Sequence, residues 1–585
     1  MKNFPAGKGL TLILLCLFLV SLPSSDPAVI NLRDQPDVKG KDWIDQKIEQ
    51  MTLEEKVGQM FIVGFQNGDR PAREMNRQAN ILIRKDHVGG IILFDRNIGT
   101  PRQVGHLTNQ LQDTALAVSP QIPLFVSVDQ EGGKVARIRE GVTNFPGNMA
   151  LGAARDEELA YQAGRVIGEE LRAMGINMNL APSLDVNNNP ANPIIGVRSF
   201  SGDPSLTSVM AKANLRGYRE GNVLSVIKHF PGHGDTSMDS HVDMPTVDHP
   251  FSRLNRVELV PFKSAIREGV DAVMSAHITF PSIDDTPGLP GTLSKKVLTG
   301  LLREKLGYDG VIMTDDMEMG AIVENFGSAE AAVRAVKAGA DIVLVCHDLT
   351  RQQQSIHAVI DAVKKGEISE KRIDHSLQRI LRLKAKKLGE HAILHQPKSR
   401  TDQMAGKVNT PENRKWAAQA AQMAITPVRN ERGVLPLDPR LSGEILAVSP
   451  TGAEELGKAL KGEGFQTGVR SISMQPKPEE VQQLVHDAAS ADVVILGAFQ
   501  WRVNDAQAKL AAELKKTGKP LIVLGLDTPY DLMAASGVKT YLALYSSQPV
   551  SMRAAARVIA GRARAEGKLP VRVPGMYPLG YADER

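Results

Sequence analysis

The chain has almost no cysteine. Its 585 residues include two, Cys16 and Cys346, and Cys16 lies in a segment that we interpret below as a leader. Once that leader is removed, no intramolecular disulfide can form, so packing alone must stabilise the fold. Cys346 ends the apolar run Ile342–Cys346, and we interpret it as a small buried hydrophobe rather than a catalytic thiol.

The chain also lacks a strong charge of either sign. Its formal net charge is +4, and its 42% hydrophobic and 23% charged residues are typical of a soluble globular protein. A charge this small gives no reason to expect a nucleic-acid partner, and it allows only weak attraction to an anionic cell wall. We expect a monomer that is at most peripherally associated with the wall.

The longest apolar run, Leu10–Val20, lies near the N-terminus. Two lysines precede it and three serines follow it, which is the order of regions in a secretory signal peptide. The run is short for a membrane span. We therefore assign residues 1–28 to a signal peptide and expect an exported protein, either secreted, wall-associated or periplasmic. An uncleaved leader that anchors the protein is an alternative, and lipidation of Cys16 is disfavoured by the bulky Leu15.

A short apolar strand followed by an amphipathic helix recurs eight times between about residues 55 and 346. Strands that are apolar throughout and alternate with helices indicate a parallel sheet. Eight such units favour a closed (β/α)8 barrel, a TIM-like α/β fold over residues 29–390, and a doubly wound open sheet is the alternative. The predicted strands are Met60–Val63, Gly90–Phe94, Leu124–Val128, Met178–Ala181, Val223–Ile227, Ala272–Ser275, Val311–Thr314 and Ile342–Val345.

A second α/β domain is predicted over residues 412–585, after a polar linker at 391–411. Four apolar strands alternate with helices there and predict an open parallel sheet. No GxGxxG follows the first of these strands, so nucleotide binding has little support. The strands are Ile445–Val448, Val493–Gly497, Leu521–Gly525 and Tyr541–Leu544.

Charged side chains follow five of the eight barrel strands. Any one of them has a structural explanation, because an aspartate at a strand end often caps the next helix. Five together favour an active site, because enzymes with this fold carry their catalytic groups at the carboxyl ends of the strands. The segments are Asp129–Gly133 with Arg137, the loop with Asp185 and Arg198, Lys228–His241, His277, and Asp315–Asp316.

Four of these segments resemble glycoside hydrolase family 3, and within it the β-N-acetylglucosaminidase branch. The block Lys-His-Phe-Pro-Gly-His-Gly-Asp-Thr is the most specific part of the likeness. The resemblance spans the barrel and continues weakly through the second domain, and the length resembles that of the larger secreted members. The segments are Lys228–His241, Asp129–Gly133, Arg198–Phe200 and Thr314–Met317.

The resemblance implies a retaining mechanism in which Asp315 is the nucleophile and forms a covalent glycosyl-enzyme. Asp316 competes for this role, but successive strand residues point to opposite faces, so we expect only one of the two to face the sugar. The resemblance also implies that His241, with Asp239 on a mobile loop, is the acid and base. A histidine can give and take a proton near neutral pH, and an aspartate can fix its tautomer.

Further positions match substrate-binding positions of the family. Carboxylates can accept from adjacent hydroxyls, and arginines supply paired donors. No metal or organic cofactor is expected. Lys228, His229, Asp129, Arg137 and Arg198 are the matching residues, and Asp185 and His277 either bind substrate or support the site from behind.

The best-supported function is hydrolysis of terminal N-acetylglucosamine from peptidoglycan fragments. The wall-derived substrate depends on the family likeness and the leader. Three alternatives stay open: a metal-dependent hydrolase built on the histidines of Lys228–His241, whose spacing matches none of the common zinc-ligand motifs; a family 3 β-glucosidase or glycoside phosphorylase; and a wall-binding protein without activity.

Overall fold

A computed structural model describes most of the chain beyond the predicted leader. The described residues are 43–240, 243–388, 404–431, 433–440, 443–502, 505–535 and 537–583. The predicted signal peptide at 1–28, most of the predicted linker at 391–411, and His241 lie outside them. Residues 44–585 form one compact unit. None of the described helices is both long enough and apolar enough to cross a membrane.

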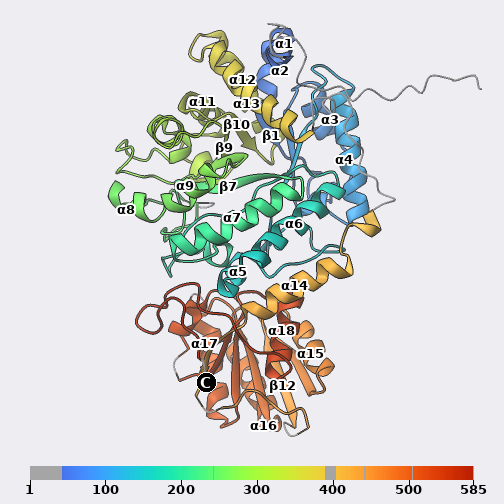
Figure 1. Cartoon of the computed structure of the whole chain (residues 1–585), viewed down its shortest axis with the longest axis vertical. Helices are drawn as coiled ribbons and strands as arrows, with labels where there is room; N and C mark the ends of the chain where they lie inside the picture. Colours follow the sequence, from blue (N-terminus) through green and yellow to red (C-terminus); the bar gives the residue numbers. More distant parts are fainter. Residues whose placement is uncertain are drawn as a thin grey trace, which may run out of the picture. The chain divides into compact units, whose positions relative to one another are not determined.

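Eight parallel strands close into a barrel in the order β1-β10-β9-β8-β7-β6-β3-β2. Figure 1 labels β1, β7, β9 and β10 among them. The predicted TIM-like barrel is confirmed, and the open-sheet alternative for this region is wrong. All eight predicted strands are present. They are β1 (Phe61–Val63), β2 (Gly90–Leu93), β3 (Phe125–Val128), β6 (Met178–Asn179), β7 (Leu224–Phe230), β8 (Ala272–Ser275), β9 (Val311–Asp316) and β10 (Ile342–Val345).

Helices cover the barrel, and their starts follow from local sequence. At the start of α7, for example, the Asp203 carboxylate accepts from the backbone N–H of Leu206 at 2.7 Å, and Pro204 occupies the first turn. The α-helices of this part are α1 (Trp43–Gln50), α2 (Leu53–Gly58), α3 (Arg77–Arg84), α4 (Pro101–Leu116), α5 (Asn148–Ala154), α6 (Glu157–Ala173), α7 (Pro204–Glu220), α8 (Phe251–Arg256), α9 (Leu259–Arg267), α10 (Gly320–Val323), α11 (Ser328–Ala338), α12 (Leu349–Lys364) and α13 (Glu370–Leu388), and a π-helix covers Lys296–Lys305 between β8 and β9.

Strand β7 is longer than the sequence predicts. We expected it to end at Ile227, but it continues to Phe230, and all seven of its residues are buried. Lys228 and His229 therefore lie on the strand and not in the loop after it. We ended the predicted strand before Lys228 because charged residues are seldom buried. In the structure, Lys228 and His229 are buried and each is paired inside the barrel.

The second domain contains a six-stranded sheet in the order β11-β16-β15-β14-β12-β13. The four predicted strands are present and parallel, but β11 pairs antiparallel with β16, so the sheet is not wholly parallel. Both β11, which contains a proline, and β13, which is largely polar, escaped prediction. The strands are β11 (Thr426–Asn430), β12 (Glu444–Ser449), β13 (Gln466–Ser471), β14 (Val493–Ala498), β15 (Leu521–Gly525) and β16 (Thr540–Ala543).

Helices flank this sheet, with α14 (Pro411–Ala424) preceding its first strand. The others are α15 (Ala453–Gly462), α16 (Pro478–Ser490), α17 (Asp505–Lys516) and α18 (Pro549–Ile559). The boundaries at 29–390, 391–411 and 412–585 stay predictions, because α13 ends at Leu388 and the chain from 389 to 403 is not described.

A buried lysine lies at the amino-terminal end of the barrel, opposite to the predicted site. The Nζ of Lys384, on α13, donates to the side-chain oxygen of Gln59 and to the backbone oxygen of Gly89, both at 2.9 Å. It also lies 4.8 Å from the ring centroid of Phe125. Burial lowers the pKa of Lys384 from 10.5 to about 7.

We predict that Lys384 makes barrel stability depend on pH. In the unfolded chain the lysine binds its proton up to about pH 10.5, whereas in the folded chain it loses the proton above about pH 7. Its contribution to the free energy of unfolding should therefore rise between these values, by at most about 1.4 kcal/mol per pH unit. Denaturant unfolding of the protein and of Lys384→Met from pH 6.5 to 10.5 measures this.

The exposed Lys386 on the same helix supplies a matched control. Lys386→Met should leave the pH dependence as it is in the parent protein. Identical slopes for the parent and Lys384→Met would contradict the prediction.

Candidate active site

A cavity of about 480 Å³ opens where the carboxyl ends of the barrel strands meet. Six of the ten residues predicted from sequence line it. They are Asp129, Arg137, Arg198, Lys228, His229 and Asp315. Of the remaining four, Asp185, His277 and Asp239 are not part of its lining, and His241 lies outside the described residues.

Two carboxylates and two cations form a buried network at one side of the cavity. The Nζ of Lys228 lies 2.6 Å from Asp129 Oδ1 and 2.8 Å from Glu131 Oε1. Arg198 donates to both oxygens of Glu131, with Nη2–Oε1 at 2.8 Å and Nε–Oε2 at 3.1 Å. The side chains of Lys228 and Glu131 are only 3% and 1% exposed, so each charge depends on the others for neutralisation.

The pKa shifts in this network follow from burial and opposite charge. Burial alone would raise the pKa of Glu131, but Arg198 and Lys228 outweigh it and lower that pKa to about 2. Burial would lower the pKa values of Arg198 and Lys228, but the neighbouring carboxylates raise both. All three groups therefore remain charged at neutral pH.

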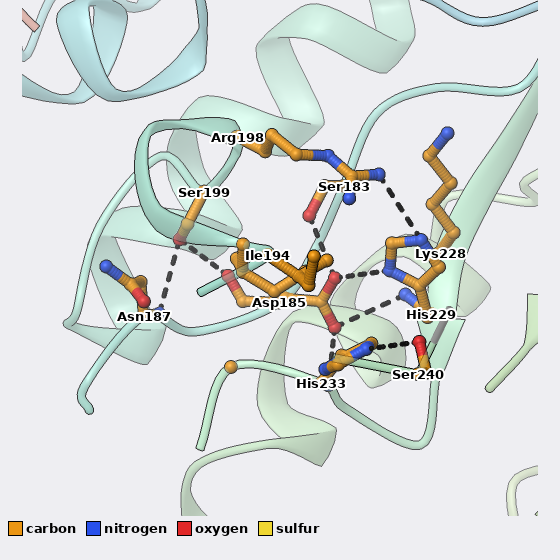
Figure 2. Close-up of polar contacts among 12 residues, drawn as sticks. Ser183, Asp185, Asn187, Ile194, Arg198, Ser199, Lys228, His229, His233 and Ser240 are labelled. Atoms are coloured by element: carbon orange, nitrogen blue, oxygen red, sulfur yellow. Dashed lines mark hydrogen bonds and ion pairs between the residues drawn. The ribbon is translucent and has the colours of Figure 1, made fainter. Parts of the chain in front are cut away.

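Asp185 lies behind the cavity wall at the centre of a second set of hydrogen bonds (Figure 2). Its Oδ2 is 2.7 Å from His229 Nδ1 and accepts from the Ser183 hydroxyl at 2.9 Å. Its Oδ1 accepts from the backbone N–H of His233 at 2.6 Å. Asp185 is fully buried, and this geometry makes it a support for the two histidines.

These contacts determine the tautomer of His229. Its Nε2 lies 3.3 Å from Nη2 of Arg198. An arginine can only donate, so Nε2 accepts, and the ring proton sits on Nδ1, where it faces Asp185. Arg198, His229 and Asp185 therefore form a chain from the ion network to the buried carboxylate.

The segment after β7 is tied together by His233. Its Nδ1 lies 2.9 Å from Thr236 Oγ1, and its Nε2 lies 3.0 Å from Ser240 Oγ. Burial and the neighbouring His229 lower the pKa of His233 to about 4, so the ring is neutral at neutral pH. Asp239 is half-buried, and its backbone oxygen accepts from the backbone N–H of Asp243 at 3.0 Å.

Asp315 and Asp316 end β9, and both line the cavity, whereas we expected only one to face it. They differ in their contacts. Asp316 Oδ1 accepts from the backbone N–H groups of Glu318 and Cys346 at 3.1 and 3.2 Å, and its Oδ2 lies 3.1 Å from His347 Nε2. Asp315 Oδ1 accepts from the backbone N–H of Asp316 at 2.8 Å.

His277 supports this strand end from behind. Its Nε2 lies 2.9 Å from the backbone oxygen of Asp316, and its Nδ1 lies 3.0 Å from Thr292 Oγ1. The residue is 1% exposed, and burial lowers its pKa. Of the two functions left open for His277, the geometry favours support over contact with substrate.

Sequence reasoning missed several residues of the site. Glu131 lies two positions after Asp129 in a segment that was singled out, so its charge and proximity could have revealed it. Phe94, Glu318 and His347 also line the cavity. The ring of Phe94 lies 5.7 Å below the guanidinium of Arg137 and forms an apolar wall, for which the sequence gives no signal beyond its place at a strand end.

A parallel barrel with carboxylates, arginines and a lysine around a cavity at the carboxyl ends of its strands is the arrangement of a barrel enzyme, and these side chains suit a substrate rich in hydroxyls. Residues 52–383 match the glycosyl hydrolase family 3 N terminal domain. The chain belongs to this family and is a glycoside hydrolase that acts on carbohydrate. No group of three or more histidine, cysteine, aspartate or glutamate side chains is placed to hold a metal ion in the part of the chain that is described.

Full-length relatives agree with this assignment. The chain is 33% identical over 549 residues to "Beta-hexosaminidase A" of Pseudoalteromonas piscicida, covering 84% of this chain and 90% of that protein. It is 28% identical to "Beta-N-acetylglucosaminidase/beta-glucosidase" of Cellulomonas fimi, covering 92% and 96%. The solved structure of a family 3 β-N-acetylglucosaminidase from Paenibacillus sp. str. FPU-7 matches with a TM-score of 0.83 and 42% identity, covering 89% and 99%.

We predict that Glu131→Gln destabilises the barrel, because it removes the negative charge that neutralises the buried Arg198 and Lys228. Loss of one partner of a buried pair costs about 3–5 kcal/mol. The folded pKa of about 2 lies below the unfolded value of 4.5, so this contribution is complete above pH 4.5 and is lost as the pH falls towards 2. Denaturant unfolding of both proteins between pH 7 and pH 2.5 measures the difference.

Asp95→Asn is the matched control. This carboxylate also pairs with an arginine of the cavity, Arg137 at 3.4 Å, but its side chain is 69% exposed. Exposed pairs contribute at most about 1 kcal/mol. A Glu131→Gln protein as stable as the control at pH 7 would contradict the prediction.

Proposed function

We propose that the protein is a retaining β-N-acetylglucosaminidase that removes terminal N-acetylglucosamine from peptidoglycan fragments. The observation that carries the proposal is the meeting of Asp315 with Asp129, Arg198, Lys228 and His229 in one cavity. A carboxylate that can attack a sugar thus lies among groups suited to holding sugar hydroxyls. The names of the Cellulomonas fimi relative and of the Paenibacillus structure support the choice of N-acetylglucosamine.

The natural substrate and the location are proposed on separate grounds. The predicted leader at 1–28 would export the protein to where wall fragments are released. The net charge of +4 permits weak attraction to an anionic wall. A saccharide released from peptidoglycan is therefore the substrate class that we propose.

The reaction has two displacements. In the first, an oxygen of Asp315 bonds to C1 of the sugar, the bond from C1 to the departing oxygen breaks, and His241 gives a proton to that oxygen. In the second, water attacks C1, His241 takes the water's proton, and the ester to Asp315 breaks. Asp239 is proposed to fix the tautomer of His241 and stabilise its charged form.

Two further activities are tested alongside. The Cellulomonas fimi relative carries β-glucosidase in its name, which makes glucosides a second substrate class to examine. Phosphate in place of water would make the enzyme a phosphorylase. Turnover of 4-nitrophenyl N-acetyl-β-glucosaminide and the matching glucoside, with and without phosphate, separates these activities, and proton NMR identifies the first-formed anomer.

We expect release of β-N-acetylglucosamine in water, slower turnover of the glucoside and no sugar phosphate. Faster turnover of the glucoside than of the N-acetylglucosaminide would indicate a β-glucosidase. A sugar phosphate as the main product would indicate a phosphorylase. A folded protein that binds N-acetylglucosamine without turnover would indicate a wall-binding protein.

Asp315→Ala should lower kcat by on the order of 10⁴-fold, because the covalent step is lost. The neighbouring Asp316→Asn supplies a comparison, since Asp316 is held by two backbone N–H groups and His347. We expect Asp316→Asn to lose less kcat than Asp315→Ala and to lose more thermal stability. Steady-state kinetics with circular dichroism melts measures both, and the reverse order of the kcat losses would assign the nucleophile to Asp316.

His241→Ala should slow substrates with poor leaving groups by about 10²–10⁴-fold, because these need a proton on the departing oxygen. Activated aryl glycosides need it much less and should lose far less in the first displacement. A series of aryl N-acetylglucosaminides with leaving groups of different pKa measures this dependence. His106→Ala, at an exposed histidine of α4, is the control, and equal losses across the series would argue against His241 as the acid.

A further inference from the structure

A second cavity, of about 180 Å³, lies at the carboxyl ends of the strands in the second domain. We call it the interdomain crevice. Residues that follow four parallel strands line it: Thr451 after β12, Phe499 after β14, Asp527 after β15, and Ser546 after β16.

The position of the crevice in the sheet is one where ligands bind. After β12 the chain forms β13 on one side, and then returns to form β14 on the other side. In open parallel sheets, ligands bind outside the carboxyl ends of the strands at such a reversal of strand order. Thr451 and Phe499 follow the two strands that flank the reversal.

Asp527 gives the crevice an acceptor without a donor. The residue is 5% exposed, and its carboxylate makes no hydrogen bond or ion pair with any residue that the structure describes. Its oxygens are not buried atoms, because they border the crevice, and a ligand there can donate to them. The neighbouring Asp531 does not offset this charge, because it is itself an acid whose pKa is raised by burial and by Asp527.

Segments of the barrel form the rest of the crevice. Gln548 Nε2 donates to the backbone oxygen of Gly133 at 2.9 Å, which fixes the second domain against this segment. Arg139 lines the crevice, but its guanidinium donates to the backbone oxygens of Ala136 and Lys134. The Lys134 ammonium is exposed and makes no ion pair with a described residue.

The lining favours a neutral ligand rich in hydroxyls. A carboxylate can accept from two adjacent hydroxyls, while an ammonium and several side-chain hydroxyls can donate to others. A neutral ligand can use Asp527 as an acceptor and Lys134 as a donor at once, whereas an ion of either sign would be repelled by one of the two. The crevice volume of about 180 Å³ corresponds to about six water molecules at roughly 30 Å³ each, and this space suits one sugar ring.

We propose that the interdomain crevice binds one sugar unit, either a free monosaccharide or the end of an oligosaccharide, separately from the catalytic cavity. The two cavities share two chain segments. In the first segment, Gly133 and Lys134 line the crevice, and Val135 and Arg137 line the catalytic cavity. In the second segment, Val197 lines the crevice and Arg198 lines the catalytic cavity. The proposal does not depend on which sugar the active site cleaves.

Calorimetric titration of the full-length protein with N-acetylglucosamine and with glucose tests the proposal. We expect the parent protein to bind two equivalents of at least one of these sugars. Asp527→Asn should bind only one equivalent, or should bind the second about tenfold more weakly than the parent does. Glu513→Gln, an exposed carboxylate on α17 of the same domain, should bind as the parent does. Titration of the catalytically impaired Asp315→Ala with the N-acetylglucosamine trimer shows whether the crevice takes the end of an oligosaccharide. Titration with N-acetylglucosamine shows whether it takes the free sugar.

One equivalent in the parent with every probe, unchanged in Asp527→Asn, would overturn the proposal, as would inorganic phosphate that competes for the second site. Folding is checked by melting without sugar, where Asp527→Asn should melt as the parent does because the Asp527 carboxylate holds no residue that the structure describes. Crystals of the parent soaked in N-acetylglucosamine give a readout without any variant, since a sugar ring in the crevice supports the proposal and water alone contradicts it. Binding stoichiometry does not require turnover, so it stands apart from the test of the proposed activity.

Discussion

The site depends on one constraint: two cations and two carboxylates must neutralise one another in a place nearly closed to water. Glu131 meets both Arg198 and Lys228, and Lys228 also meets Asp129. These residues come from three different chain segments that follow or end barrel strands. Since each charge would be costly alone, their pairing fixes the positions of these segments relative to one another. The cavity wall is thereby set before any substrate arrives.

Around this rigid network the structure arranges residues in two layers. Asp129, Lys228 and His229 face the cavity, while Asp185 and His277 hold histidine rings and strand ends from behind. Preorganised groups of this kind cost no reorganisation when charge develops during the reaction. The proposed acid, His241, follows Ser240 in the sequence, and Ser240 ends the segment that His233 ties together.

Much of the fold could be predicted because apolar strands alternate with amphipathic helices, and this pattern gave all eight barrel strands. It failed where burial and polarity conflict. Lys228 is charged yet buried, so β7 was ended too early, and β13 is polar yet paired. Individual charged residues of the site were found because they follow strands, but the partner of each was not, because pairing such as Glu131 with Arg198 joins residues 67 positions apart. Nor could the sequence reveal a crevice whose walls come from both domains.

The central claim is that the carboxylate of Asp315 bonds to C1 of the sugar during turnover. The most direct measurement is mass analysis of peptides after inactivation with a fluorinated sugar that forms the glycosyl-enzyme rapidly and loses it slowly. The account predicts one added sugar per chain, located on Asp315. A sugar on Asp316 or on any other residue, or inactivation without a covalent adduct, would contradict it.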